Sequence, residues 1–154
     1  MSRSFSRREF LTRGVAAAAA AAAIPALLGA RAGTAMVVYK DPNCGCCTSW
    51  VTLMRAAGFD ISVRDTADVQ SVKQRYKVPQ ALASCHTALV GGYVIEGHVP
   101  ADLINRLLKD KPKVLGLAVP GMPVGSPGME GGTKQAYDVV TFDAAGKTTV
   151  YARR

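Results

Sequence analysis

Hydrophobic and polar positions follow two different spacings along the chain after residue 35. Short apolar or alternating runs predict strands over residues 35–39, 59–63, 87–90 and 93–96. Apolar residues spaced three and four positions apart predict helices over residues 46–57, over residues 68–76 and from Pro100 onward. Gly91 and Gly92 separate the third and fourth strands and predict a tight hairpin.

The order of these elements is β-α-β-α-β-β-α, which is that of a thioredoxin-like domain, so the pattern predicts an α/β fold of this kind. The segment that follows departs from it. Residues 119–132 read VPGMPVGSPGMEGG and have no periodicity, which predicts a functional Gly/Pro/Met loop folded back on the domain. Residues 137–142 and 148–151 flank a turn and predict a terminal β-hairpin. We therefore expect one domain over residues 36–154.

Residues 1–35 carry a separate pattern, with a basic start, an alanine-rich apolar stretch and small residues at the end. This order predicts a signal peptide that is cleaved near residues 32–35. Residues 6–11 read SRREFL and resemble a twin-arginine export signal. The apolar stretch is shorter than the ~20 residues that a membrane span needs. We therefore expect a periplasmic protein with no stable membrane span after cleavage, and an uncleaved N-terminal anchor is the alternative.

The charge of the domain is modest once the signal peptide is set aside. The whole chain has a net charge of +8, but five of its 19 basic residues and one of its 11 acidic residues precede Met36, which leaves +4 for the rest. A short basic cluster at residues 109–113 fits a solvated helix end better than a nucleic-acid patch. We expect no nucleic-acid partner.

Three nearly contiguous cysteines carry the first part of the candidate chemistry. Cys44, Cys46 and Cys47 lie between a predicted strand and the start of a predicted helix, where unpaired backbone N–H groups favour thiolates. Cys44 and Cys47 have the C-x-x-C spacing of a thioredoxin-type redox pair and can form a disulfide in an oxidising compartment. Cys46 would invite disulfide scrambling in a redox catalyst, whereas it adds a ligand to a thiolate metal site.

Cys85 and His86 directly precede the predicted strand at residues 87–90. In a thioredoxin-like fold the loop that enters this strand packs against the C-x-x-C pair, so we expect Cys85 to converge with the other three cysteines and His86 to lie nearby. The alternative for His86 is an exposed loop histidine. We interpret His98 as part of the cap region of the helix that begins at Pro100, with metal ligation as the alternative.

Met122 and Met129 lie in the aperiodic loop rather than on a helix face. Thioether sulfur is a soft ligand that selects copper(I) over zinc, so both methionines are candidate ligands. The alternative is that they hold the loop on the domain by packing.

Three segments give the chain a resemblance to the exported CopG-type copper-resistance family, long catalogued as a domain of unknown function and distinct from the DNA-binding repressor of similar name. They are YKDPNCGCC at residues 39–47, VPQALASCHTALVGGYVIEGHVP at residues 78–100 and LAVPGMPVGSPGME at residues 117–130. The resemblance implies a thioredoxin-like fold, a periplasmic location and a role in handling copper or a related metal. It implies no particular reaction.

Three functions remain open, and metal binding is favoured over enzymatic activity. The first is a protein that binds copper(I), or silver, for resistance or for delivery to other periplasmic copper-handling proteins, with these candidate ligands: Cys44, Cys46, Cys47, Cys85, His86, Met122 and Met129. The second is a thiol–disulfide or copper-linked oxidoreductase with Cys44 and Cys47 as its catalytic pair. The third is a zinc site of the Cys₃His type, for which the three adjacent cysteines are crowded. The spacings disfavour an iron–sulfur cluster.

Overall fold

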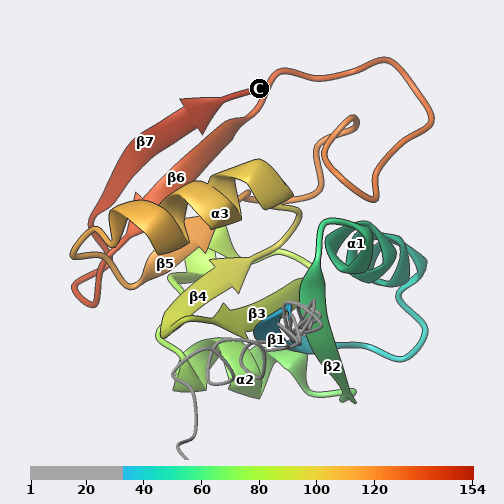
Figure 1. Cartoon of the computed structure of the whole chain (residues 1–154), viewed down its shortest axis with the longest axis horizontal. Coiled ribbons are helices and arrows are strands. Elements are labelled where there is room, and N and C mark those ends of the chain that lie inside the picture. Colours follow the sequence, from blue (N-terminus) through green and yellow to red (C-terminus); the bar gives the residue numbers. More distant parts are fainter. Residues whose placement is uncertain (1–32) are drawn as a thin grey trace, which may run out of the picture. The chain divides into compact units, whose positions relative to one another are not determined.

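A computed structural model describes residues 33–154 of the chain. The predicted signal peptide lies outside the described residues except for its last three. In the described part, seven strands form one mixed sheet in the order β2-β1-β3-β4-β5-β6-β7 (Figure 1). None of the helices in this part combines the length and the hydropathy that crossing a membrane requires.

The first seven main elements follow the order that the sequence predicts. They are β1 (Thr34–Lys40), α1 (Gly45–Ala56), β2 (Phe59–Asp65), α2 (Val69–Arg75), β3 (His86–Val90), β4 (Tyr93–Glu96) and α3 (Ala101–Asp110). A short 3₁₀ turn, η1 (Gln80–Leu82), precedes β3. Strand β1 pairs in parallel with β2 and antiparallel with β3, and β3 pairs antiparallel with β4. The predicted α/β class is confirmed.

One strand of the sheet was not predicted from the sequence. Strand β5 (Gly116–Ala118) pairs in parallel with β4 and antiparallel with β6 (Asp138–Phe142), which pairs with β7 (Thr148–Arg153). At Gly116 an added Cβ would lie 1.8 Å from the carbonyl oxygen of Val94, so only glycine permits this approach. The terminal hairpin therefore continues the main sheet through β5.

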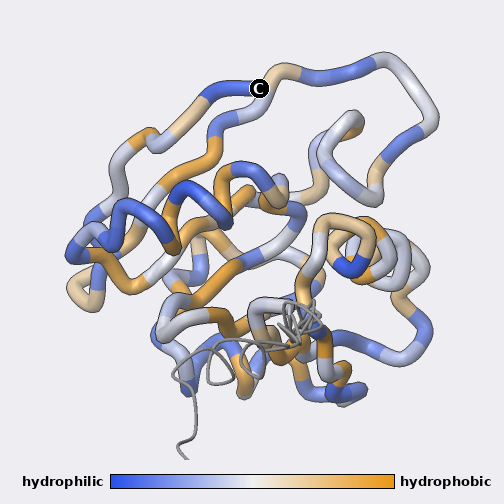
Figure 2. The backbone as a smooth tube through the Cα atoms, viewed as in Figure 1, coloured by the Kyte–Doolittle hydropathy of each residue, from blue (hydrophilic) through white to orange (hydrophobic). Residues whose placement is uncertain are grey.

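Apolar side chains cover both faces of the sheet because successive strand residues point to opposite sides. Ile95 and Leu117 join the larger core cluster with the buried faces of α1 and α3, whereas Val94 and Ala118 join a smaller cluster with Leu82. Figure 2 shows hydrophobic stretches along the central strands and alternating hydrophobic and hydrophilic positions along α3.

The segment between β5 and β6 lies beside α1 (Figure 1). Gly128 in this segment has a φ of +89°, and a Cβ there would lie 2.8 Å from the carbonyl oxygen of Cys46 and 2.9 Å from the backbone N of Trp50. The loop thus packs directly on the first turn of α1.

Candidate metal centre

A buried lysine shapes the turn that presents the first three cysteines. The ammonium group of Lys40 donates to the carbonyl oxygen of Asp41 at 3.0 Å and pairs with the carboxylate of Asp65 at 3.1 Å. The backbone N–H of Cys44 in turn donates to the carbonyl oxygen of Asp41 at 3.1 Å. Cys44 is the N-cap residue of α1, and its side chain makes no capping hydrogen bond. The sulfur atoms are therefore presented at the helix start without being used to build the helix.

The four cysteines lie together, as expected from the sequence, with their sulfur atoms all within 4.8 Å of one another. Cys44 and Cys47 form a disulfide, while Cys46 and Cys85 are free thiols. The sulfur of Cys46 is 3.5 Å from that of Cys44 and 3.9 Å from that of Cys85. Cys46 is thus in contact with both the disulfide and the second free thiol.

Two histidines extend this cluster through Cys85. Its sulfur lies 3.4 Å from Nδ1 of His86 and 2.9 Å from Nε2 of His98. The donor atoms of these three residues also lie within 4.8 Å of one another, so Cys85 belongs both to the sulfur set and to a sulfur–imidazole set.

His86 is fully buried, so the alternative of an exposed loop histidine is wrong. Its ring centroid lies 4.4 Å from that of Trp50 and 5.2 Å from that of His98. Its Nε2 atom is buried and has no hydrogen-bond partner among the described residues. Because a buried polar atom is normally paired, His86 is unusual in keeping one ring nitrogen without a partner inside the described fold.

His98 lies two residues before the N-cap of α3, in the predicted cap region, but its ring contacts other parts of the fold. Pro100 is the N-cap of α3, and no side chain caps that helix. The Nδ1–H of His98 donates to the carbonyl oxygen of Pro127 at 2.7 Å, which leaves the Nε2 lone pair directed at Cys85. Histidines that bind metals generally donate their other ring N–H to a carbonyl or carboxylate oxygen. His98 therefore has the arrangement of a metal-binding imidazole.

The sequence contained a signal for this contact. The glycine pair at residues 91–92 sets the register of the β3–β4 hairpin, in which Val90 lies opposite Tyr93 and Thr87 opposite Glu96. Continuing the same register by two positions places Cys85 opposite His98. The hairpin thus brings together two residues that are 13 positions apart.

Burial sets the protonation of these groups. It lowers the pKa of His86 well below 6.5, and the charges of His98, Lys73 and Lys40 lower it further. Burial also lowers the pKa of His98, although its hydrogen bond to Pro127 acts in the opposite direction. Burial and the neighbouring Cys46 raise the pKa of the Cys85 thiol to about 12. Near neutral pH both imidazoles are therefore uncharged, and the Cys85 thiol is protonated.

The loop that carries both methionines is attached at the same end of the molecule. The side chain of Ser84 donates to the carbonyl oxygen of Gly121, next to Met122, and Gly128 on the first turn of α1 precedes Met129. Met122 is 51% exposed and Met129 is half-buried. The ligand roles of both methionines remain predictions.

The close packing of Gly128 gives a first test of this architecture. We expect Gly128→Ala to destabilise the protein by about 1–3 kcal/mol more than Gly131→Ala, because its methyl group overlaps the backbone of α1. Gly131 is a matched control, since its φ is also positive, at +106°, but a Cβ there would meet nothing within 4 Å. Denaturant unfolding of the two variants measures the difference, and equal stabilities would contradict the packing of the loop on α1.

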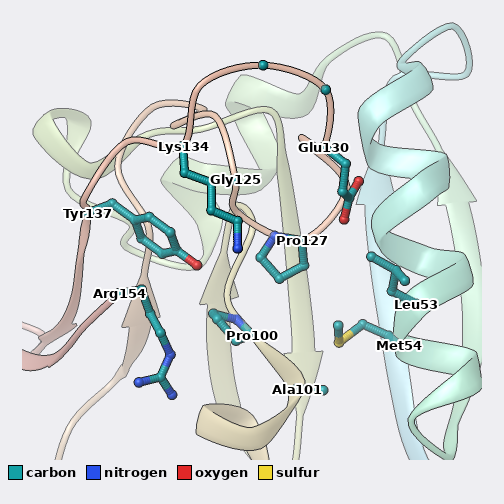
Figure 3. A pocket seen from close by; sticks show the side chains of 12 residues that line it. Leu53, Met54, Pro100, Ala101, Gly125, Pro127, Glu130, Lys134, Tyr137 and Arg154 are labelled. Atoms are coloured by element: carbon teal, nitrogen blue, oxygen red, sulfur yellow. The ribbon is translucent and has the colours of Figure 1, made fainter.

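A cavity of about 550 Å³ lies between this loop, α1 and the start of α3. Figure 3 shows Lys134 and Tyr137 on one side of it and Leu53, Met54 and Glu130 on the other. Its lining includes Pro127, whose carbonyl oxygen holds His98, but none of the four cysteines. The cavity is therefore separate from the candidate metal centre.

The fold and the site define an α/β protein with a cysteine–histidine cluster that is suited to a metal ion. Residues 82–129 match the family model described as "Protein of unknown function, DUF411". Two solved structures, of "Copper resistance protein copG" in Form 1 and in Form 2, are each 44% identical to the chain, with a TM-score of 0.75. Each match covers 79% of this chain and 98% of the solved one, and no curated protein matches. The chain belongs to the CopG-type copper-resistance family.

Proposed function

We propose that the protein binds copper(I) in the periplasm for copper resistance or delivery, using the thiols of Cys44, Cys46, Cys47 and Cys85. The observation that carries the proposal is the convergence of four sulfur atoms and two imidazoles around Cys85. Thiolate sulfur and neutral imidazole are ligands that copper(I) accepts in two- or three-coordinate geometry, which zinc does not favour. Silver(I) is similarly soft and is the alternative ion.

The residues of the site have distinct parts in this proposal. Cys46 and Cys85 supply two sulfurs in the state described here, and reduction of the Cys44–Cys47 disulfide supplies two more. His98 offers Nε2, because its Nδ1–H is held by Pro127. His86 offers one ring nitrogen from the buried side of the cluster. The loop with Met122 and Met129 would close over the ion and add soft thioether sulfur.

We also propose that the segment from β1 to α3 has a thioredoxin-like topology. It is supported by the strand order β2-β1-β3-β4, in which β3 runs antiparallel to both neighbours, and by a C-x-x-C pair at the start of α1. The periplasmic location is supported by the predicted signal peptide, and by a disulfide that suits an oxidising compartment.

The disulfide also favours a second candidate function, a copper-linked oxidoreductase. Formation of the Cys44–Cys47 bond releases two electrons and two protons from the two thiols. Two copper(II) ions would each accept one electron and become copper(I), so the reaction balances without another reactant.

Metal analysis of protein isolated from the periplasm, with thiol counting on the same sample, tests the leading proposal. We expect bound copper, and thiols that resist alkylation until the metal is removed.

Cys46→Ser should lower copper(I) affinity by about tenfold or more, because it removes a ligand. The double variant Met122→Leu/Met129→Leu removes both thioether sulfurs, so it should weaken copper retention. Because leucine keeps the apolar bulk, folding and zinc affinity should stay unchanged.

The competing functions give different results in the same experiment. Under the oxidoreductase alternative Cys46 is dispensable, and replacement of Cys44 abolishes turnover of a disulfide or copper(II) substrate. Zinc found in place of copper, with unchanged copper affinity in both variants, would overturn the leading proposal.

A further inference from the structure

A buried charged network contacts the loop that carries Cys85. The carboxylate of Glu96, at the end of β4, is fully buried and pairs with the ammonium group of Lys73 from α2 at 2.5 Å. The hydroxyl of Thr87 donates to the same carboxylate at 2.7 Å. The third donor is the backbone N–H of Ser84, at 2.6 Å. Two of the donors come from α2 and β3, and the third comes from the loop that carries Cys85.

The contact between Glu96 and Ser84 is made by the residue directly before Cys85. Ser84 precedes Cys85 in the connection between η1 and β3, before the first residue of the β3–β4 pairing. Its N–H therefore needs an acceptor from elsewhere in the fold, and Glu96 supplies a charged one. Ser84 is also confined by Gly97, where an added Cβ would lie 2.6 Å from the side chain of Ser84.

Glu96, Gly97 and His98 are consecutive, so one short segment sets both sides of the contact between Cys85 and His98. The side chain of Glu96 holds Ser84, the backbone N–H of Gly97 donates to the carbonyl oxygen of His86 at 3.0 Å, and Nε2 of His98 faces the Cys85 sulfur. A buried ion pair contributes little net stability compared with apolar side chains of the same volume. Its effect here is on geometry.

We propose that Glu96 is a positioning residue for the metal site: acting through the N–H of Ser84, its carboxylate holds the Cys85 thiol between Cys46 and His98. This inference rests on the proposed copper-binding function. Lys73 pairs with one oxygen of the buried carboxylate and orients it, and the hydroxyl of Thr87 donates to the other oxygen.

Two double variants isolate the contact with Ser84 from the ion pair. Lys73→Met/Glu96→Gln and Lys73→Met/Glu96→Met both remove the two buried charges together, so neither leaves an unpaired charge. The side chains at position 96 are similar in size, but only glutamine retains an oxygen that accepts from Ser84. Thr87→Val is a further control, because it removes the two hydrogen bonds that Thr87 makes, to Glu96 and from Lys73, and leaves the contact between Glu96 and Ser84 in place.

Three measurements are made on each variant: thermal unfolding, the alkylation rate of Cys85 by iodoacetamide in reduced metal-free protein, and copper(I) retention against a chelator. We expect the glutamine variant and Thr87→Val to stay within about twofold of wild type in the last two measurements. In the methionine variant Cys85 should alkylate about five- to tenfold faster, and copper(I) retention should fall by a similar factor, as loss of one hydrogen bond predicts.

Equal alkylation rates of Cys85 in the two folded double variants would overturn the proposal. If the methionine variant does not fold, Glu96→Asp replaces it. This change keeps the charge that faces Lys73 but shortens the reach to Ser84, and an unchanged Cys85 rate would again overturn the proposal. Failure of wild-type protein to retain copper(I) would refute the proposed function, while the alkylation rates in metal-free protein still decide the role of Glu96.

Discussion

Reduction of the Cys44–Cys47 disulfide is expected to raise the affinity of the protein for copper(I) by at least about a hundredfold. This exceeds the change in affinity that follows when a residue that hydrogen-bonds to a metal ligand is lost, because reduction adds two ligands. Reduction changes the number of available thiols at the site from two to four, all within 4.8 Å of one another. Closely spaced thiolates can also bridge ions, so the number of bound copper ions should rise as well.

Anaerobic titration of the reduced and oxidised proteins with copper(I), in competition with a chelator, measures this difference. In the loaded reduced protein all four thiols should be protected from alkylation. The double variant Cys44→Ser/Cys47→Ser is the matched control, because it has the same two free thiols with or without reductant. Equal affinities of the oxidised and reduced wild-type protein would mean that Cys46, Cys85 and the histidines suffice, and would favour an electron-transfer role for the disulfide pair.

The predictable part of the fold was the part with strong periodicity. The amphipathic pattern of α3, with Leu103, Ile104 and Leu107 buried, and the glycine pair of the β3–β4 hairpin each specify a local structure on their own. Strand β5 was missed because three residues are too few to show a period, and its place in the sheet depends on the approach of Gly116 to Val94. That approach is a tertiary contact and leaves no local pattern.

The site divides in the same way. The cysteines were found because C-x-x-C spacing and position before a predicted helix are local features, whereas His98 was assigned from its neighbour Pro100 rather than from its partner across the hairpin. Glu96 gave no local signal at all. A charged residue at a strand end normally faces solvent, and its burial here depends on Lys73, which arrives from α2 and is 23 positions away.

Cys85→Ser is expected to have the largest effect of any single substitution at the site. Among the described residues, Cys85 is the one donor that belongs to both the sulfur set and the sulfur–imidazole set. A serine hydroxyl is a hard ligand that copper(I) does not favour, so its introduction removes the link between the two sets. We expect copper(I) affinity to fall by more than about a hundredfold, compared with about tenfold for Cys46→Ser, which affects only the sulfur set.

The same substitution should leave the fold intact, which makes the comparison interpretable. Serine is close to cysteine in size, and its hydroxyl can donate to Nε2 of His98 in place of the thiol, so the hydrogen bond from His98 to Pro127 is retained. Thermal unfolding of both serine variants checks this point. A folded Cys85→Ser protein that retains copper(I) as well as wild type does would contradict the role of Cys85 and would place the metal on the cysteines at the start of α1.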